Sequence, residues 1–376
     1  MTTVLLTLGR LPKALDLARG FSKAGCRVLV AEPYGWTLAG ASRHVAREFK
    51  VPPPSAGKAA YLAALAQIVA REGVDLVVPV SEETMHVAHL AEMLPEGVRL
   101  FTMPPSQVLA LHDKASFVRK AAAMGLAVPE SAPLGSAEAE VLARGGPVVV
   151  KPIYSCSGNG LSVLRGDEPL PPADPARPMV VQRFVEGREH STCTIAQGGQ
   201  VVSTMVYRGA VMSGSVAVAF ERVEAPAIAA WTRRFVAETG WTGFISFDFI
   251  VDAAGVPYAI ECNPRATSGV HFWEPTDIAR AVLEPGWAGP VRVRRHATLQ
   301  QFYACLTETQ GAMLRRKGFW PALRSLVTTR DVSWDWRDPW PFASMIGTSS
   351  PIIWQSITQG ARFGEVATQD VGWYED

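Results

Sequence analysis

The pattern of apolar and polar residues predicts alternating strands and helices over the first 105 residues. Apolar runs at residues 4–8, 27–31, 75–80 and 98–102 have the length of buried strands. Helical spacing links Leu11, Leu15, Ala18 and Phe21, and residues 61–69 show it again. Strands that alternate with helices predict an open parallel sheet and an α/β fold. The first turn, at residues 8–12, lacks the G-x-G-x-x-G pattern of dinucleotide sites.

Residues 244–263 have the pattern of a β-hairpin. Apolar residues alternate before a turn at 252–255, and residues 257–262 form the returning strand. Asp248 lies about as far before the turn as Glu261 lies after it, so the two carboxylates are expected to meet across the ladder. Asn263 is two residues beyond Glu261 and is therefore expected on the same strand face.

These three side chains predict a metal site. Two carboxylates and an amide oxygen form an all-oxygen cluster that suits Mg²⁺, which keeps waters and takes further ligands from phosphates. The alternative is a surface hairpin with solvated acids. Apolar residues on both sides of the two acids disfavour that alternative.

A loop of small residues precedes this hairpin by about 100 positions. The apolar run at 148–150 ends in Lys151, small residues follow at 155–160, and a second run occupies 161–164. Backbone N–H groups of such a loop can approach phosphate oxygens closely. No Gly-Lys-Ser/Thr opens a helix here, so the loop is not of the Walker A type. Taken alone, the pattern fits a flexible hairpin equally well.

Together these motifs resemble the ATP-grasp superfamily. The residues D-F-x-V-D at 248–252 and I-E-x-N-P-R at 260–265 look like its metal-binding end. The resemblance covers residues 105–275 by motif and residues 1–104 by architecture alone. It implies a Rossmann-like N-terminal domain at 1–105, grasp lobes at 106–182 and 183–290, and a C-terminal extension at 291–376. It also implies ATP as cofactor with Mg²⁺, or Mn²⁺ in its place, held by Asp248, Glu261 and Asn263.

The same resemblance implies the nucleotide contacts. Lys151 would contact the α- and β-phosphates and assist the reaction, and Lys114, at the start of the helix that Asp113 is expected to cap, would contact the α-phosphate. The remaining candidates are the glycine loop, the hinge residue Gln182 for the adenine amine, the hinge backbone, and an acid for the ribose. They are Ser157, Gly158, Asn159, Gly160, Gln182, Phe184, Val185 and Glu189. Gln182 is the main departure, because Glu is common at this position in the superfamily.

Arg265 is the main candidate for substrate chemistry. It lies two residues past Asn263 and should point into the same cleft, and in many ATP-grasp ligases an Arg here binds the acyl phosphate or the substrate carboxylate. Arg208, Ser268 and His271 are further candidates for substrate contacts. For Arg208 a surface position remains open, and for His271 a structural role is preferred.

The expected activity is that of an ATP-dependent ligase. A carboxylate would be activated as an acyl phosphate and coupled to an amine, with release of ADP and phosphate. Phosphorylation of another acid or enol oxygen, or carboxylation, is an alternative, although no Met-Lys-Met biotin-carrier sequence is present. A non-catalytic ATP sensor or scaffold is the other alternative. Small-molecule acids and amines are thus the expected partners.

The last 85 residues differ from the rest. They contain six of the eleven tryptophans, with helices expected at 297–314 and 320–326 and poor periodicity beyond residue 331. A packed extension is favoured, and a substrate lid or a homodimer contact is the alternative.

Composition and charge restrict the class of protein. Hydrophobic residues make up 48% of the 376 residues, as in a folded globular protein, and the net charge of +1 favours neither a nucleic-acid nor a membrane partner. No run approaches the length of a membrane span. Five cysteines without C-x-x-C spacing predict free thiols in a reducing compartment, with the cytoplasm as the expected location.

Overall fold

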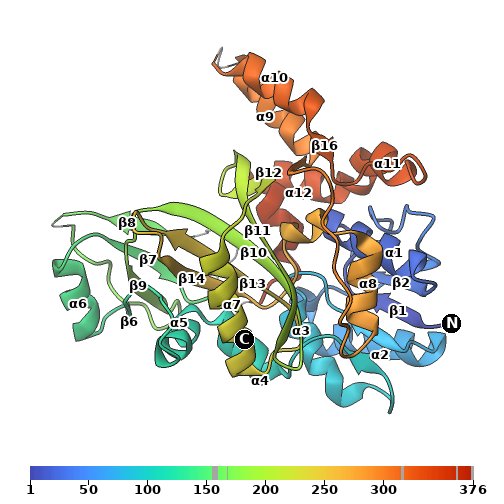
Figure 1. Ribbon diagram of the computed structural model, residues 1–376, viewed down its shortest axis with the longest axis horizontal. Coiled ribbons are helices and arrows are strands. Elements are labelled where there is room, and N and C mark those ends of the chain that lie inside the picture. Colours follow the sequence, from blue (N-terminus) through green and yellow to red (C-terminus); the bar gives the residue numbers. More distant parts are fainter. Residues whose placement is uncertain (155–159, 167, 315–316, 361–362, 374–376) are drawn as a thin grey trace.

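The computed structural model describes residues 1–154, 160–166, 168–314, 317–360 and 363–373. Its strands form three sheets of five, seven and four strands. In Figure 1 the N-terminal sheet lies at one end, the four-stranded sheet at the other, and the seven-stranded sheet between them. The predicted α/β class is confirmed.

The N-terminal sheet is parallel, with the strand order β3-β2-β1-β4-β5. Doubly wound sheets have this order, and their ligands bind in the crevice at the carboxyl ends of the strands. Continuous apolar runs such as β1 form the strands because helices cover both faces. The elements are β1 (Thr3–Leu6), α1 (Pro12–Lys23), β2 (Arg27–Glu32), β3 (Arg47–Lys50), α2 (Lys58–Glu72), β4 (Leu76–Val78), α3 (Thr84–Val87), β5 (Arg99–Leu100) and α4 (Pro105–His112).

The four-stranded sheet is antiparallel, in the order β6-β9-β7-β8. Helix α5 enters this part of the chain, and Asp113 caps it as predicted by accepting a hydrogen bond of 2.8 Å from the Ser116 backbone N–H. The elements are α5 (Lys114–Ala123), β6 (Ser131–Pro133), α6 (Ala137–Arg144), β7 (Val148–Pro152), β8 (Ser162–Leu164) and β9 (Met179–Arg183).

The seven-stranded sheet contains the predicted hairpin as its edge pair, in the order β14-β13-β10-β11-β12-β15-β16. The turn at 252–255 forms because Asp252 Oδ1 accepts from the Val256 N–H at 2.8 Å and Gly255 takes a positive φ of 82°. The elements are β10 (Arg188–Gln197), β11 (Gln200–Ser213), β12 (Val216–Arg222), α7 (Pro226–Thr239), β13 (Gly243–Val251), β14 (Pro257–Asn263), α8 (Pro275–Leu283), β15 (Thr298–Gln300) and β16 (Arg330–Asp331).

One face of α1 fastens the N-terminal unit to the rest of the chain. Lys13, Asp16 and Arg19 are three residues apart, so they share this face. Lys13 Nζ donates to the Ala266 carbonyl at 2.8 Å, and Arg19 Nε donates to Asp338 Oδ2 at 2.9 Å. Buried polar groups are thus paired across the junction, which fixes how the sheet edges meet.

The C-terminal region corrects two expectations. The predicted helix at 297–314 begins later, at α9 (Phe302–Leu314), because residues 298–300 pair with β12 as a strand. The poor periodicity beyond residue 331 gave no prediction of helices there. In the described residues, three further helices follow α10. The helices are α10 (Phe319–Thr328), α11 (Trp340–Thr348), α12 (Ser350–Gln359) and α13 (Phe363–Gln369). Among the described helices, none combines the length and apolar character that a membrane crossing requires.

Candidate active site

The acidic hairpin is formed as predicted. Asp248 on β13 and Glu261 on β14 are direct antiparallel partners, so their carboxylates lie on one face of the ladder. Ser191 on β10 donates to Asp248 Oδ1 at 2.6 Å, and Asn263 Nδ2 donates to Asp248 Oδ2 at 2.9 Å. The three candidate metal ligands therefore converge on one spot between three neighbouring strands.

The electrostatics of this spot favour a cation. Burial, together with the charge of Glu261, raises the pKa of Asp248 to about 7, so the pair holds its negative charge at an energetic cost. A divalent ion between the carboxylates would remove that cost. Asn263 would supply its oxygen after its amide turns over, since its Oδ1 now accepts from Arg265 Nη2 at 3.1 Å.

The donor set fits Mg²⁺ and not a metal held by protein alone. No group of three or more His, Cys, Asp or Glu gathers for a metal within the described ranges. Two carboxylates and one amide leave several coordination positions for waters and phosphate oxygens, which is the way Mg²⁺ is usually bound.

Two buried lysines from the other lobe approach the acidic hairpin. Lys114 Nζ lies 3.6 Å from Glu261 Oε2, and Lys151 Nζ donates to the Ile260 carbonyl at 2.9 Å. Both side chains are almost fully buried. Burial lowers the pKa of Lys151 to about 8, although the charge of Glu261 opposes this shift. The predicted phosphate contacts thus come together at the acids, around a space where anionic oxygens would be neutralised.

The hinge residues have hydrogen-bond partners within the protein. Gln182 is buried, its Oε1 accepts from Lys151 Nζ at 3.0 Å, and its Nε2 donates to Ser131 Oγ at 3.0 Å. The Phe184 N–H donates to the Pro147 carbonyl at 3.0 Å. The amide oxygen of Gln182 therefore orients the lysine, and its predicted contact with an adenine amine stays a prediction, as does the role of Val185.

The other nucleotide candidates lie in different settings. Glu189 is exposed on β10, two residues before Ser191, and its charge adds to the raised pKa of Asp248. Gly160 takes a positive φ of 74°, with the Pro152 ring beside its Cα. Ser157, Gly158 and Asn159 lie outside the described residues.

Arg265 connects the hairpin to the parallel sheet. It forms an ion pair with Glu82, which follows β4, and donates to Asn263 as described above. Although burial alone would raise the pKa of Glu82, the Arg265 charge holds it down at about 2. Arg265 therefore lies beside the candidate metal ligand Asn263, as its place in the sequence predicts.

Sequence reasoning missed a second polar cluster at this point. Glu82, Glu83, Lys13 and His112 are all buried and interact electrostatically with one another or with Arg265. Burial and Arg265 lower the pKa of Lys13 to about 7, and burial lowers the pKa of His112 to about 4. A signal was present in the sequence, because Ser-Glu-Glu at 81–83 follows a predicted parallel strand at its carboxyl end.

The three further substrate candidates lie in other settings, and none is among the partners of Asp248 and Glu261 described above. His271 is buried, with its Nδ1 2.6 Å from Asp16 Oδ2, as the structural interpretation expects. Arg208 on β11 pairs with Glu221 at 2.9 Å and is half-exposed. Ser268 begins the short 3₁₀ helix at Ser268–Phe272.

Comparisons with known proteins agree with this geometry. A family model described as an ATP-grasp domain matches residues 111–269, the part that holds both lysines and the acidic hairpin. Residues 111–269 are therefore an ATP-grasp domain. Its recognition from sequence motifs is confirmed, and so are ATP and Mg²⁺ as the cofactors expected of an ATP-grasp chain.

Curated relatives and solved structures extend the similarity beyond this domain. The carbamoyl phosphate synthase large chain of Rubrobacter xylanophilus is 27% identical over 201 residues, which are 48% of this chain and 19% of that protein. This chain therefore spans about a fifth of the length of that relative. An ADP complex of N5-carboxyaminoimidazole ribonucleotide synthetase matches with a TM-score of 0.63 at 16% identity, covering 84% of this chain and 85% of that one. The L-amino acid ligase of Bacillus licheniformis matches with a TM-score of 0.57 at 16% identity and 78% coverage of both chains.

Proposed function

We propose that this chain is an ADP-forming ligase that activates a small carboxylic acid as an acyl phosphate and couples it to an amine. The observation that supports this most is that Lys114 lies 3.6 Å from Glu261, while Lys151 and Arg265 lie close enough to interact electrostatically with the Asp248 carboxylate. Three cations around two acids suit the transfer of a phosphoryl group between anionic oxygens.

Each side chain then has a defined task. Lys114 and Lys151 hold phosphate oxygens from one side, and Gln182 keeps the Lys151 ammonium in place. Asp248 and Glu261 would hold Mg²⁺, which when bound neutralises charge on the phosphate groups. Because Lys151 is buried, its charge is poorly screened by water and acts strongly on nearby oxygens.

Arg265 would orient the acid substrate. Its guanidinium can take a carboxylate or a mixed anhydride through two parallel hydrogen bonds, which a lysine cannot do. The guanidinium forms an ion pair with Glu82, so an incoming carboxylate would either replace Glu82 as its partner or bind beside it. The crevice at the ends of β1 and β4 is the place where the acid and then the amine would meet the phosphoryl group.

Relatives give the proposal general support. The similar N5-carboxyaminoimidazole ribonucleotide synthetase was solved with ADP, and another similar structure is that of an L-amino acid ligase. The four described cysteines are unpaired and buried, which supports a reducing compartment, the cytoplasm, as the place of the reaction.

The test is a matrix of carboxylic acids and amines incubated with ATP and Mg²⁺, in which ADP, AMP and phosphate are all quantified. Release of ADP and phosphate that needs both an acid and an amine supports the ligase. ADP release that needs an acid but no amine, with a stable phosphorylated product, would mean a kinase. ATP binding without turnover under every condition would mean a sensor or scaffold, and formation of AMP would overturn the acyl phosphate.

A further inference from the structure

Exposed apolar side chains concentrate in the C-terminal region. Nineteen large hydrophobic residues in the described chain are exposed, and eleven of them lie between Met313 and Phe363. Scattered single residues of this kind are normal on a protein surface, but a concentration in one region marks an interaction site.

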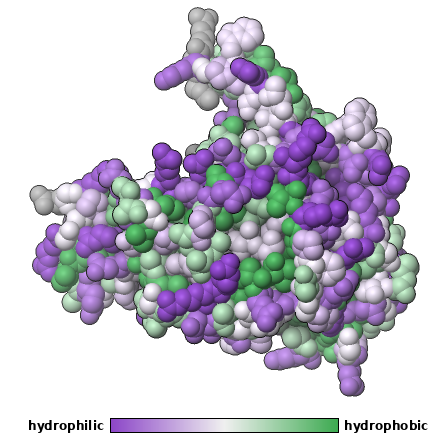
Figure 2. Space-filling model, viewed as in Figure 1, coloured by the Kyte–Doolittle hydropathy of each residue, from purple (hydrophilic) through white to green (hydrophobic). Residues whose placement is uncertain are grey.

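The hairpin of α9 and α10 presents part of this surface at its far end. Its base is anchored, because Cys305 and Leu326 pack against Val218 and Ala219 of β12. From there the two helices project away from the rest of the molecule (Figure 1), and the space-filling view shows the projection standing clear of the neighbouring surface (Figure 2).

The side chains at the projecting end are apolar to an unusual degree. Met313, Leu314 and Trp320 are 53%, 79% and 75% exposed. Met313 and Leu314 end α9 and Trp320 lies at the start of α10, so both helices contribute to one apolar end. A tryptophan beside aliphatic residues is typical of segments that enter the interface between water and lipid.

Positive charge is gathered in the same place. Residues 302–328, from the start of α9 to the end of α10, contain four arginines and lysines and one acidic residue, Glu308, whereas the other residues of the chain contain 32 basic and 34 acidic ones. Glu308 accepts a hydrogen bond from Ser213 Oγ at 2.7 Å, and Lys317, Arg324 and Arg330 are exposed. The sequence of the hairpin therefore has a net charge of +3, while the rest of the chain has a net charge of −2.

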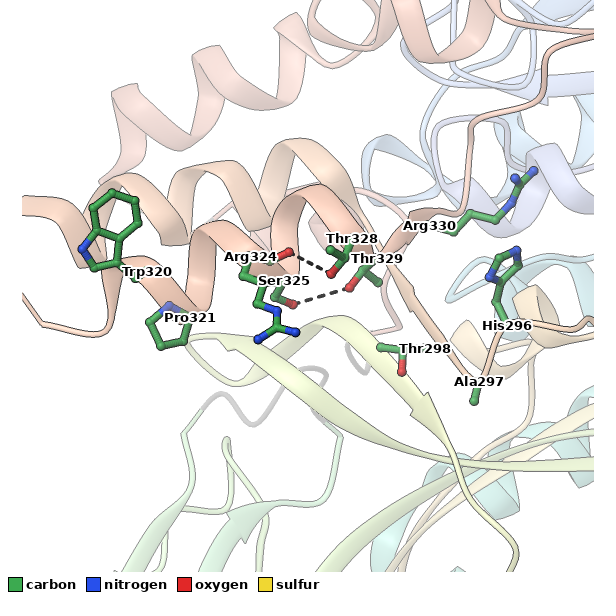
Figure 3. Close-up of a pocket in the computed structure, with 10 residues that line it drawn as sticks. All are labelled: His296, Ala297, Thr298, Trp320, Pro321, Arg324, Ser325, Thr328, Thr329 and Arg330. Atoms are coloured by element: carbon green, nitrogen blue, oxygen red, sulfur yellow. Dashed lines mark hydrogen bonds between the residues drawn. The ribbon is translucent and has the colours of Figure 1, made fainter.

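A groove beside α10 is lined by some of these basic side chains. It has a volume of about 820 Å³ and lies between α10 and the segment that leads into β15. In Figure 3, Trp320 and Arg324 line one end, and His296 and Arg330 lie together at the other. Hydroxyl groups such as that of Ser325 lie between them, so cationic and neutral donors line a groove that can receive phosphate groups.

We propose that the α9–α10 hairpin docks this chain on an anionic lipid surface. Met313, Leu314 and Trp320 enter the headgroup region, and Lys317 and Arg324 contact lipid phosphates beside them. This is peripheral attachment, in which burial of apolar side chains and attraction to anionic lipids add together.

Other occupants fit the surface less well. A second copy docking through the same hairpin would bring two segments of net positive charge together, because a two-fold interface uses the same patch on both subunits. A nucleic acid would be attracted by the charge and could stack on Trp320, but it would leave the exposed aliphatic side chains of Met313 and Leu314 without a partner. Lipid is the partner that uses both the charge and the aliphatic end.

The test is flotation of the purified full chain with phosphatidylcholine vesicles that contain or lack phosphatidylglycerol, at low and high salt. The chain should float with the anionic vesicles and be released by salt. The double variant Leu314→Asp with Trp320→Asp should lose binding, and Lys317→Glu with Arg324→Glu should weaken it by about fivefold or more for each charge. Val141→Asp is the matched control, because Val141 is 62% exposed on α6 and lies outside the hairpin.

Each variant is accepted only if its unfolding temperature and circular dichroism match the wild type. The proposal is overturned if the wild type does not float with anionic vesicles at low salt, or if the Leu314 and Trp320 variant floats equally well. A concentration-dependent dimer that Leu314→Asp dissociates, without vesicle binding, would assign the surface to a second copy. Binding of an oligonucleotide or of inorganic phosphate without vesicle binding would also overturn it.

Discussion

Arg265, at the end of the acidic hairpin, forms an ion pair with Glu82, at the end of the parallel strand β4. Their side chains are 15% and 3% exposed, so the contact is largely shielded from water. Removing one partner of such a pair leaves the other charged and buried, which is costly. The pair therefore holds the acidic hairpin and the crevice of the N-terminal sheet against each other, and several of the predictions below depend on that arrangement.

Asp16→Asn should destabilise the fold by about 3 kcal/mol or more. Asp16 is buried on α1 and accepts from Arg294 Nη2 at 2.7 Å, while His271 lies at 2.6 Å. The asparagine would keep the shape and remove the charge, leaving Arg294 without its partner. Urea unfolding measures the loss, with Asp174→Asn as the control because Asp174 is exposed. Equal stability of the two variants would contradict the importance of this contact.

Glu261→Gln should keep the fold and abolish turnover. The substitution preserves size but removes one of two carboxylates that face each other across the ladder, so the site loses a metal ligand and half of its charge. Mg²⁺-dependent ADP release and the unfolding temperature are measured together. Glu238→Gln, on the exposed face of α7, is the control. An unchanged kcat in Glu261→Gln would remove this residue from the metal site.

Sequence reasoning reached the acidic hairpin because the evidence there is local. The turn at 252–255 fixes the register, and strand alternation then places Asp248 opposite Glu261. The cluster of Lys13, Glu82 and His112 was missed because it depends on how α1 and β4 dock against a hairpin far along the chain. The sequence pattern within either segment does not predict a contact with a residue so far along the chain.

The C-terminal errors have related causes. Residues 298–300 were assigned to a helix because they adjoin a helical segment, but pairing with β12 makes them a strand. Helices α11 and α12 were missed because Pro341 and Pro351 obscure their periodicity, although a proline in the first turn is compatible with a helix. Tertiary contacts therefore decide these elements more than local preference does.

Lys151→Ala should lower kcat/KM for ATP by about 10² or more, as expected when a preorganised phosphate contact is lost. Lys151 is buried and oriented by Gln182 and the Ile260 carbonyl, so water does not readily replace its charge. Steady-state kinetics with ATP varied give the ratio, and Lys120→Ala on the exposed face of α5 is the control. A change below threefold would contradict a phosphate contact.

Stability should fall as the pH drops from about 6.5 to 4, with His112 as one cause. Burial lowers its pKa from 6.5 to about 4 in the folded chain, so the unfolded chain binds more protons across this window. The contribution is on the order of 3 kcal/mol. His112→Gln should reduce the change in unfolding free energy across this pH window by this amount, and so give a shallower slope against pH. An identical slope in the variant and the wild type would show that His112 does not cause it.

Arg265→Lys should keep ATP binding and lose most amide formation. A lysine preserves the positive charge beside Asn263 and Glu82 but lacks the planar fork that holds an acyl phosphate by two hydrogen bonds. With the wild type, the acid substrate and hydroxylamine should yield a hydroxamate together with ADP, which reports the activated acid directly. With Arg265→Lys, hydroxamate formation should fall by about 10² while ATP protects the variant against unfolding as it protects the wild type. If hydroxamate and amide are both formed at wild-type rates, Arg265 does not hold the activated acid. If AMP and pyrophosphate appear in place of ADP, attack occurs at the α-phosphorus, and the lysines and the acidic hairpin must then orient a different phosphate from the one proposed.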